Sequence, residues 1–414
     1  MIGVALAALA VAISALGAVA ALAGWAFAAR FAAQAAQEAQ EKPVSALPPI
    51  TVLKPLHGAE PGLEEALASV CRQDYPEFQI IFGVQDAADP ARAVAAGLAA
   101  RFPALPIAIV VDPAQHGANR KISNLINMYR LARHETLVIA DSDVIAAPDY
   151  LRRIAAALAR PGVGLATTLY AGRPLVAGLA ARLGAMQITY GFLPGALLSR
   201  AMGRQDCLGA TMALRAATLA RVGGLQALAD HLADDNALGR KVAGLGLDVA
   251  LAGTVVETGV PEATLGALFS HELRWARTIR ALVPAGFAAS ALQYPILWAA
   301  IAFAAAPAER TALLIGLAWL ARAAAARGIG AVLGVPGPQA KGGVGLAFPA
   351  PLWLLPLREL MSVAVMIASY SGRGVVWRGH RLHADGPAPL TSADPMPPVA
   401  TQGVLPGMNP SEGR

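Results

Sequence analysis

Ile139-Ala-Asp-Ser-Asp-Val-Ile145 is the stretch that decides the fold of this chain. Apolar residues from Leu137 to Ala140 predict a buried strand, and Asp141 and Asp143 follow at its carboxyl end, where open α/β sheets bind their ligands. Residues i and i+2 of an extended stretch point the same way, so these like charges repel unless a cation or a shared proton lies between them. A hard divalent cation that also binds a diphosphate would satisfy both carboxylates. The alternative is a solvated strand-to-helix turn in which one Asp caps the helix.

Length and composition indicate a membrane protein with a sizeable folded core. Of the 414 residues, 56% are hydrophobic and only 14% are charged, whereas soluble domains carry about 25% charge. The net charge of +6 suits a protein that lies against anionic lipid or handles an anionic substrate. No long basic run with interleaved aromatic residues is present, so nucleic acid is not an expected partner. Cys71 and Cys207 are too few for a disulfide framework and are not spaced as metal ligands, which agrees with a cytoplasmic catalytic part.

Residues 1–31 are predicted to form an N-terminal transmembrane helix. Ile2 to Ala29 carry no charge and are long enough to span a bilayer, and they lack the basic start of a secretory signal. The first basic residues, Arg30 and Lys42, follow the span, so the positive-inside rule places the next domain in the cytoplasm. Residues 32–48 are expected to form a helical extension or linker.

Residues 49–283 are predicted to form a cytoplasmic α/β domain. Short apolar strands alternate here with amphipathic helices, which favours a mostly parallel sheet. The expected strands are 50–53, 78–84, 107–111 and 136–140, and the expected helices are 61–72, 91–102 and 121–132.

Residues 284–370 are predicted to form a C-terminal transmembrane region. Phe287–Ala306 and Phe348–Tyr370 are candidate spans, and Thr311–Leu333 is a weaker one because two arginines interrupt it. Arg358 and Glu359, inside the last candidate, are expected to pair or to face protein.

The tail, residues 371–414, is predicted to be basic and then disordered, since it is rich in Pro, Gly and Ser from Ala384 onward. Three C-terminal spans would place its basic residues outside, against the positive-inside rule, and a re-entrant segment would resolve that conflict.

Two polar groups come early in the α/β domain. Asp86 and Asp89 follow the second strand, where a carboxylate can accept hydrogen bonds from a nucleobase or ribose; the alternative is a plain Asp-Ala-Ala-Asp-Pro turn. Gly117-Ala-Asn-Arg-Lys-Ile-Ser-Asn-Leu125 opens a helix with Arg120 and Lys121, and helix N-termini favour anions. The alternative there is a basic first turn exposed to solvent.

Two further groups come later. Asp234 and Asp235 begin a helix that only one of them can cap well, so the other is available as a general base; paired capping acids are the alternative. In His271-Glu-Leu-Arg-Trp-Ala-Arg-Thr-Ile-Arg280, three arginines share a helical face. Arg274 beside Trp275 is suited to a phosphate and a stacked sugar or base, and the later arginines to lipid headgroups. A simple interfacial anchor is the alternative.

In this order the motifs resemble the membrane-bound inverting glycosyltransferases with a GT-A fold, and most closely the ceramide glucosyltransferase family, with its bacterial relatives of hopanoid biosynthesis. The resemblance extends over about Pro49 to Arg280. The stretches that carry it are Thr51-Val-Leu-Lys-Pro-Leu-His-Gly58, Gln73-Asp-Tyr-Pro76, Val84-Gln-Asp-Ala-Ala-Asp-Pro90, Asn119-Arg-Lys-Ile-Ser-Asn-Leu125, Asp141-Ser-Asp143, Asp234-Asp235 and Arg274-Trp275.

The resemblance implies a multi-pass protein of the bacterial inner membrane that moves N-acetylglucosamine or glucose from a UDP-sugar to a lipid hydroxyl. The hopanoid bacteriohopanetetrol is the first expected acceptor and ceramide the second. A polyprenyl-phosphate glycosyltransferase and a polysaccharide synthase are further alternatives, although a processive synthase would need more spans. A transporter or scaffold would not need the ordered acids.

The resemblance also implies roles by position. It assigns Mg²⁺ or Mn²⁺ and the diphosphate to Asp141 and Asp143, the catalytic base to Asp235, and the leaving-group charge to Arg274 beside Trp275. His271 stands at the first position of a Q/R-x-x-R-W box, where the family has Gln or Arg. The residues expected to contact the donor nucleotide or its phosphates are Asp86, Asp89, Lys121, Asp141 and His271. The apolar run from Ala185 to Met202 then predicts an interfacial helix at a lipid entrance, with a plain core helix as the alternative.

Overall fold

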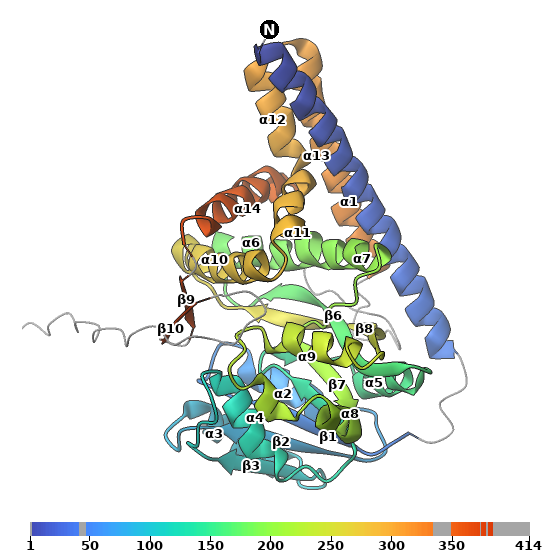
Figure 1. Ribbon diagram of the computed structural model, residues 1–414, viewed down its shortest axis with the longest axis vertical. Helices are drawn as coiled ribbons and strands as arrows, with labels where there is room; N and C mark the ends of the chain where they lie inside the picture. Colours follow the sequence, from blue (N-terminus) through green and yellow to red (C-terminus); the bar gives the residue numbers. More distant parts are fainter. Residues whose placement is uncertain (1, 41–46, 334–348, 373, 378–379, 384–414) are drawn as a thin grey trace, which may run out of the picture.

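The computed structural model describes residues 2–40, 47–333, 349–372, 374–377 and 380–383. An upright group of helices stands on a layer of helices that lie across its axis, and this layer covers a domain built on a β-sheet (Figure 1). The predicted disorder from Ala384 onward lies outside the described residues.

The described residues form an eight-stranded sheet with the order β3-β2-β1-β4-β7-β6-β8-β5. Its strands are β1 (Ile50–Pro55), β2 (Phe78–Val84), β3 (Ile107–Val111), β4 (Thr136–Ala140), β5 (Val144–Ile145), β6 (Val163–Pro174), β7 (Thr211–Arg215) and β8 (Asp248–Val260). The four predicted strands, β1 to β4, pair with one another in parallel. The later half is mixed, because β7 is antiparallel to both β4 and β6, and β5 is antiparallel to β8. The α/β class is confirmed, but the sheet is wholly parallel only in its first half.

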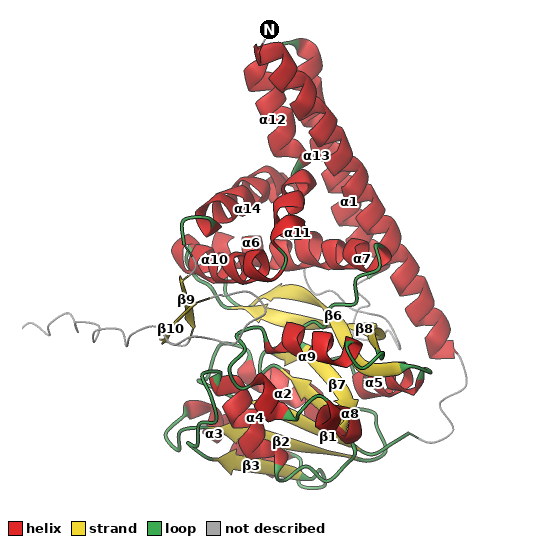
Figure 2. Ribbon diagram, in the orientation of Figure 1, coloured by secondary structure: helices red, strands yellow, loops and turns green. Residues whose placement is uncertain are grey.

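Apolar side chains fill both faces of this sheet, which explains the nearly unbroken apolar runs of its strands. Ile80 and Phe82 of β2 belong to one buried cluster and Ile81 between them to another, because successive side chains of a strand point to opposite faces. Helices cover the two clusters (Figure 2). These are α2 (Leu63–Cys71), α3 (Pro90–Arg101), α4 (Arg120–Tyr129), α5 (Tyr150–Ala159), α8 (Ala216–Arg221), η2 (Leu225–Leu228) and α9 (Asp234–Ala243).

The layer between the sheet and the upright helices contains the predicted interfacial segment 185–202. The chain runs through α6 (Leu179–Gln187), a π-helical turn η1 (Ile188–Phe192) and α7 (Leu193–Ala201) without leaving the layer (Figure 1). Pro194 lies in the first turn of α7, where a residue without an amide hydrogen is tolerated, so the π-helical turn rather than a kink precedes it. The layer also holds α10 (Leu265–Leu282), α11 (Pro284–Ala289) and, after η4 (Leu352–Leu354), α14 (Leu355–Ser369).

The upright group consists of α1 (Ile2–Gln40), α12 (Pro295–Ala305) and α13 (Glu309–Val332), which contact one another. Within the described residues, α1, α13 and the segment 352–369 are long and apolar enough to cross a membrane. The expected continuous span 287–306 is instead bent by 69° between residues 284–293, which end in η3 (Ser290–Gln293), and α12. Pro295 begins α12 at this bend, where its missing amide hydrogen costs nothing.

The chain returns from the upright group to the side of the sheet. α12 and α13 form a hairpin, and α14 then lies across the layer (Figure 1). β9 (Gly374–Trp377) and β10 (His380–His383) follow as an antiparallel pair.

Candidate active site

Asp141 and Asp143 lie on the two sides of a tight turn between β4 and β5. The amide of Val144 donates to the carbonyl of Asp141 at 3.3 Å. This stretch is therefore a turn and not the extended segment that the sequence had predicted. The chain reverses here because β5 runs antiparallel to β8. The two carboxylates consequently have different partners: Nζ of Lys121 lies 2.7 Å from Oδ1 of Asp141, and the hydroxyl of Thr258 donates to Oδ2 of Asp143.

The two carboxylates still repel each other, and a second buried cation lies behind the turn. Burial and the charge of Asp141 raise the pKa of Asp143. Lys54 of β1 is 0% exposed, and its Nζ donates to the carbonyl of Val144 at 3.4 Å. Burial lowers the pKa of Lys54 to about 8, although Asp143 and Asp141 oppose that shift. The sequence analysis did not identify Lys54 or Thr258 as site residues. Lys54 could have been found, because a lysine inside an otherwise apolar strand is unusual.

Lys121 joins the two acidic motifs. Its Nζ lies 3.3 Å from Oδ2 of Asp234 as well as 2.7 Å from Asp141. Asn119 holds it in place, since its side chain accepts from the amide of Ile122 and donates to the carbonyl of His231 at 2.8 Å. Burial alone lowers the pKa of Lys121, but the two carboxylates outweigh burial and raise it. The cation expected to receive a substrate anion thus bridges two protein carboxylates.

Asp235 has the properties of a proton acceptor. α9 begins at Asp234, and neither acid caps it; Ala233 holds the N-cap position. Asp234 contacts Lys121, while Oδ1 of Asp235 accepts from the amide of Asn236 at 2.7 Å. Burial, and then the charge of Asp234, raises the pKa of Asp235 to about 7, with Lys121 opposing the shift. A carboxyl group that titrates near neutrality is matched to general-base catalysis.

Tyr170 connects Asp141, Asp143 and Asp235 to the interfacial layer, the layer of helices between the sheet and the upright group that contains α6, η1 and α7. Its phenol on β6 has a pKa raised first by burial and then by the charges of Asp235, Asp141 and Asp143. The ring stacks on Phe192 of the π-helical turn, with 4.7 Å between centroids. Tyr170 thus lies between the acids and the helices that face the upright group.

The box His271–Trp275 on α10 lies beside the end of β8, close to Tyr170. Trp275 and Tyr170 both pack against one apolar cluster, which contains Val260 at the end of β8, two residues after Thr258. The rings of His271 and Trp275 meet edge to face at 4.5 Å, and Nδ1 of His271 pairs with a carboxylate oxygen of Glu262. Burial would raise the pKa of Glu262, but this bond, the charges of His271 and Arg274 and a backbone hydrogen bond together lower it.

The later arginines of the box helix bind protein, contrary to the expectation that they reach lipid headgroups. Arg277 donates to the carbonyl of Gly374 and Arg280 to that of Gly372, and Arg280 also lies 4.9 Å from the Tyr370 ring centroid. Both therefore hold the segment that follows α14.

Asp86 and Asp89 form the local turn that was the alternative for them. Asp89 caps α3 by accepting from the amide of Ala91, and it accepts a second amide, that of Gly58, at 3.0 Å. Asp86 accepts from the amide of Ala88 but is exposed at the carboxyl end of β2. The carboxyl ends of β2 and β4 lie at the same edge of the sheet, so the nucleotide contact of Asp86 stays a prediction. The carboxylate of Asp89, in contrast, already accepts hydrogen bonds from two backbone amides.

The donor set at the turn fits a hard divalent cation bound together with a substrate. Asp141 and Asp143 offer carboxylate oxygens. Burial, and then the charge of Asp141, raises the pKa of Asp143, and a bound cation would relieve the repulsion between the two acids. No group of three or more His, Cys, Asp and Glu side chains suited to a metal occurs in the part of the chain that the structure describes. Two carboxylates completed by diphosphate oxygens and water are the usual environment of Mg²⁺ in such sites.

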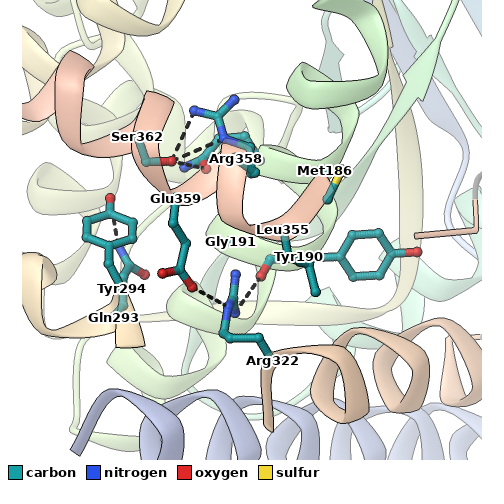
Figure 3. A pocket seen from close by; sticks show the side chains of 11 residues that line it. Met186, Tyr190, Gly191, Gln293, Tyr294, Arg322, Leu355, Arg358, Glu359 and Ser362 are labelled. Atoms are coloured by element: carbon teal, nitrogen blue, oxygen red, sulfur yellow. Dashed lines mark hydrogen bonds and ion pairs between the residues drawn. The ribbon is translucent and has the colours of Figure 1, made fainter. Parts of the chain in front are cut away.

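A buried polar network fixes the box helix to the helices above it. On α14, Arg358 makes a bidentate ion pair with Glu272 of α10, at 2.8 and 2.7 Å. Glu359 lies 3.1 Å from Arg322 of α13 and accepts the amide of Ile296 at the start of α12. Arg322, Arg358 and Glu359 line one pocket between these helices; Figure 3 shows Arg322 and Glu359 directed toward each other and Arg358 directed toward Ser362. Arg358 and Glu359 therefore face protein, as expected, and each pairs with a residue of another helix.

The fold is GT-A-like, as predicted. The mannosyltransferase PcManGT from Pyrobaculum calidifontis, solved in complex with GDP-Man and Mn²⁺, matches with a TM-score of 0.50 over 86% of this chain and 99% of its own. At 19% sequence identity this is a likeness of fold.

The chain belongs to glycosyl transferase family 21, whose sequence profile matches residues 6–387. It is similar to the ceramide glucosyltransferase of Komagataella phaffii, with 34% identity over 27% of this chain and 23% of that protein. Ceramide glucosyltransferase 3 of Caenorhabditis elegans is 22% identical over 58% of this chain and 52% of its own length. The chain thus spans from a quarter to half of these relatives. The predicted relationship to ceramide glucosyltransferases is confirmed.

Proposed function

We propose that this protein transfers glucose or N-acetylglucosamine from a UDP-sugar to the hydroxyl group of a membrane lipid, with inversion at the anomeric carbon. The observation that carries the proposal is the position of Asp235. Its carboxyl group has a pKa raised to about 7, and it shares Tyr170 with the interfacial layer. A base in this place can meet a nucleotide sugar from the sheet side and a lipid from the helix side.

The residues of the site divide the chemistry between them. Asp235 accepts the proton of the lipid hydroxyl as that oxygen attacks the anomeric carbon from the face opposite the diphosphate. Lys121 holds Asp141 and Asp234 at 2.7 and 3.3 Å and so fixes both acidic motifs before the substrate arrives. Arg274, with Trp275 beside it, stabilises the charge of the departing diphosphate. Mg²⁺ or Mn²⁺ held by Asp141 and Asp143 would supply further positive charge to the diphosphate.

The proposed cellular setting is a bacterial inner membrane, with the sheet domain in the cytoplasm. Arg30 is the first charged residue after the apolar part of α1, and the arginines of α10 lie on the same side of the upright helices. Both agree with the positive-inside rule.

A hopanoid polyol, with bacteriohopanetetrol as the first choice, is the acceptor that we propose from the resemblance of the sequence motifs. Ceramide is the second candidate, and the similarity to ceramide glucosyltransferases favours it. Both acceptors offer a primary or secondary hydroxyl group on an uncharged lipid, so the same base serves either.

The transfer itself is tested with purified protein in neutral detergent, UDP-glucose or UDP-N-acetylglucosamine, and a lipid alcohol. Asp235→Asn should abolish transfer and retain donor binding, and EDTA should stop turnover until Mg²⁺ or Mn²⁺ is restored. Glu77→Gln, an exposed acid ahead of β2, is the matched control and should keep full activity. Full activity of the Asp235 variant would exclude its role as base, and turnover unaffected by EDTA would exclude the metal.

The acceptor is tested in a hopanoid-producing bacterium that lacks its own hopanoid glycosyltransferase. Expression of this chain should restore a sugar-bearing hopanoid in the lipid extract, and the Asp235→Asn variant should not. If a ceramide-fed host made glycosylated ceramide but no sugar-bearing hopanoid, ceramide would be the acceptor and the hopanoid polyol would be excluded.

A further inference from the structure

A cleft at the lower end of the apolar part of α1 collects arginines from three distant parts of the sequence. It has a volume of about 360 Å³ and lies between α1, α7 and β8, with Arg160 of the segment after α5 at its side. Arg30 comes from α1 and Arg200 from α7, and Phe27 and Phe31 form part of the apolar wall. None of these residues belongs to the proposed active site.

The cleft carries more positive charge than its own acids neutralise. Glu38 is the acid in its lining, and it is occupied by an ion pair of 2.6 Å with Arg160. Arg200 donates to the carbonyl of Val249 and forms no ion pair within the described residues. Burial lowers its pKa, although the charges of Asp206 and Asp248 oppose that shift. Arg30 contacts the face of Phe27, with 5.6 Å from its guanidinium carbon to the ring centroid, and has no carboxylate partner within residues 2–40, 47–333 and 349–372. Two guanidinium groups therefore remain for a ligand.

The position of the cleft matches the boundary of a bilayer. Arg30 follows the uncharged run Ile2–Ala29, and α1 packs closely on α7 just above the cleft, where a Cβ on Gly24 would lie 2.8 Å from Pro194. An apolar wall thus continues upward from the arginines. Guanidinium groups bind phosphate oxygens in a planar, two-pronged geometry, and basic pockets beside membrane helices on the cytoplasmic side suit anionic headgroups.

We infer that this cleft binds the phosphate of an anionic phospholipid such as phosphatidylglycerol, whose acyl chains run along Phe27 and Phe31 of α1. The inference requires the proposed membrane location but not the proposed reaction. The glycosyl acceptor is uncharged and has its hydroxyl group at Asp235. β8 separates the two sites, since Gly253 lines the cleft and Thr258 contacts Asp143, a distance on the order of 15 Å along the strand.

The test titrates phosphatidylglycerol or phosphatidylcholine into the purified full-length protein in neutral detergent and counts bound lipid by native mass spectrometry. The wild-type protein should bind phosphatidylglycerol at least about tenfold more tightly than phosphatidylcholine, because charged pairs of this kind contribute more than about 1.4 kcal/mol. Arg30→Gln combined with Arg200→Gln should remove that preference, and Arg30→Lys should keep most of it.

Arg182→Gln is the matched control, because Arg182 is an exposed arginine of the same layer, on α6, that does not line the cleft. It should bind phosphatidylglycerol as the wild type does. If the double variant unfolds, Arg30→Gln alone decides, since Arg30 is exposed and its loss should still weaken binding several-fold. Equal affinity for both lipids in the wild type, or an unchanged preference in Arg30→Gln and in the double variant, would overturn the inference. Full displacement of the lipid by an equal concentration of inorganic phosphate would assign the cleft to a free anion instead.

Discussion

The carboxyl group of Asp235 is buried and lies next to Asp234, and each of these circumstances favours its protonated form. Lys121 acts in the opposite direction but does not cancel them. The pair Asp234-Asp235 was visible in the sequence, yet which acid would pair with a cation depended on how α4 docks against α9. Side chains from both helices had to be placed before the two acids could be told apart.

The raised pKa of Asp235 predicts a pH dependence of transfer. A base acts only when deprotonated, and the deprotonated fraction of Asp235 grows as pH rises through about 7. Transfer at low substrate concentration should therefore increase about tenfold per pH unit below that value and level off above it. The pH profile of kcat/KM measures this dependence. In Asp235→Glu the rising part of the profile should shift along the pH axis relative to the wild type. A flat profile from pH 5 to about 8 would contradict the assignment.

Gly209 gives a second prediction, because Asp235 can act as the proposed base only from its present position. A Cβ at this residue would lie 2.9 Å from Oδ2 of Asp235 and would force the carboxylate to shift. Gly209→Ala should lower kcat by about 10- to 100-fold, since small displacements of a catalytic group cost this much. Gly97→Ala in α3 is the control, because a Cβ there meets no atom within 4 Å. Activity of the Gly209 variant within twofold of wild type would show that the base tolerates the shift.

Among the elements, α10 and α14 depend on each other through one ion pair. Arg358 and Glu272 are 3% and 7% exposed and meet in two hydrogen bonds. A buried charge that loses its partner is costly, and the box residues His271 and Trp275 are on the same helix as Glu272. The sequence indicated that Arg358 needed a partner, but it gave no sign that the partner lay inside the box.

This ion pair predicts an unequal response to single and double substitution. Glu272→Gln should lower the free energy of unfolding by about 3–5 kcal/mol and the activity with it, because Arg358 stays buried without a counter-charge. Glu272→Leu together with Arg358→Leu should recover at least half of that loss. Thermal unfolding in detergent compares the variants, with Arg101→Ala in the exposed Arg101–Glu64 pair expected to cost below about 1 kcal/mol. Additive losses in the double variant would refute the coupling.

At the scale of the whole molecule, the chain reverses twice in its upright helices. α1 begins where the α12–α13 hairpin turns, since a Cβ on Gly3 would lie 3.0 Å from the carbonyl of Ala305. The sheet domain and the β9–β10 pair lie at the other end (Figure 1). The hairpin turn and the sheet domain are therefore expected on opposite sides of the membrane.

A cysteine-labelling experiment checks that topology. Cys71 and Cys207 are buried, so cysteines added at exposed positions report on their own surroundings. Ala308→Cys, in the hairpin turn, should react with a membrane-impermeant maleimide in intact cells. Ala87→Cys, at the carboxyl edge of the sheet, should react only after the cells are permeabilised. Labelling of both in intact cells, or of neither, would contradict the arrangement.

Local pattern predicted much of the early fold. The strands β2, β3 and β4 begin and end where the sequence placed them, because short apolar runs bounded by turns have few other ways to be buried. β6, β7 and β8 were not predicted, and the antiparallel pairing of β7 depends on contacts distant in sequence. A continuous span had been expected where the chain bends just before Pro295, the first residue of α12.

By itself the sequence determined the α/β class, the apolar first helix, the family and the order of the acidic motifs, because these depend on residue type and local spacing. Only the tertiary structure decided the partners. It turned Asp141-Ser-Asp143 into a tight turn, placed Lys121 between Asp141 and Asp234, and raised the pKa of Asp235. Burial and charge at a site are set by elements that are far apart in the chain, so they exist only once those elements are packed together.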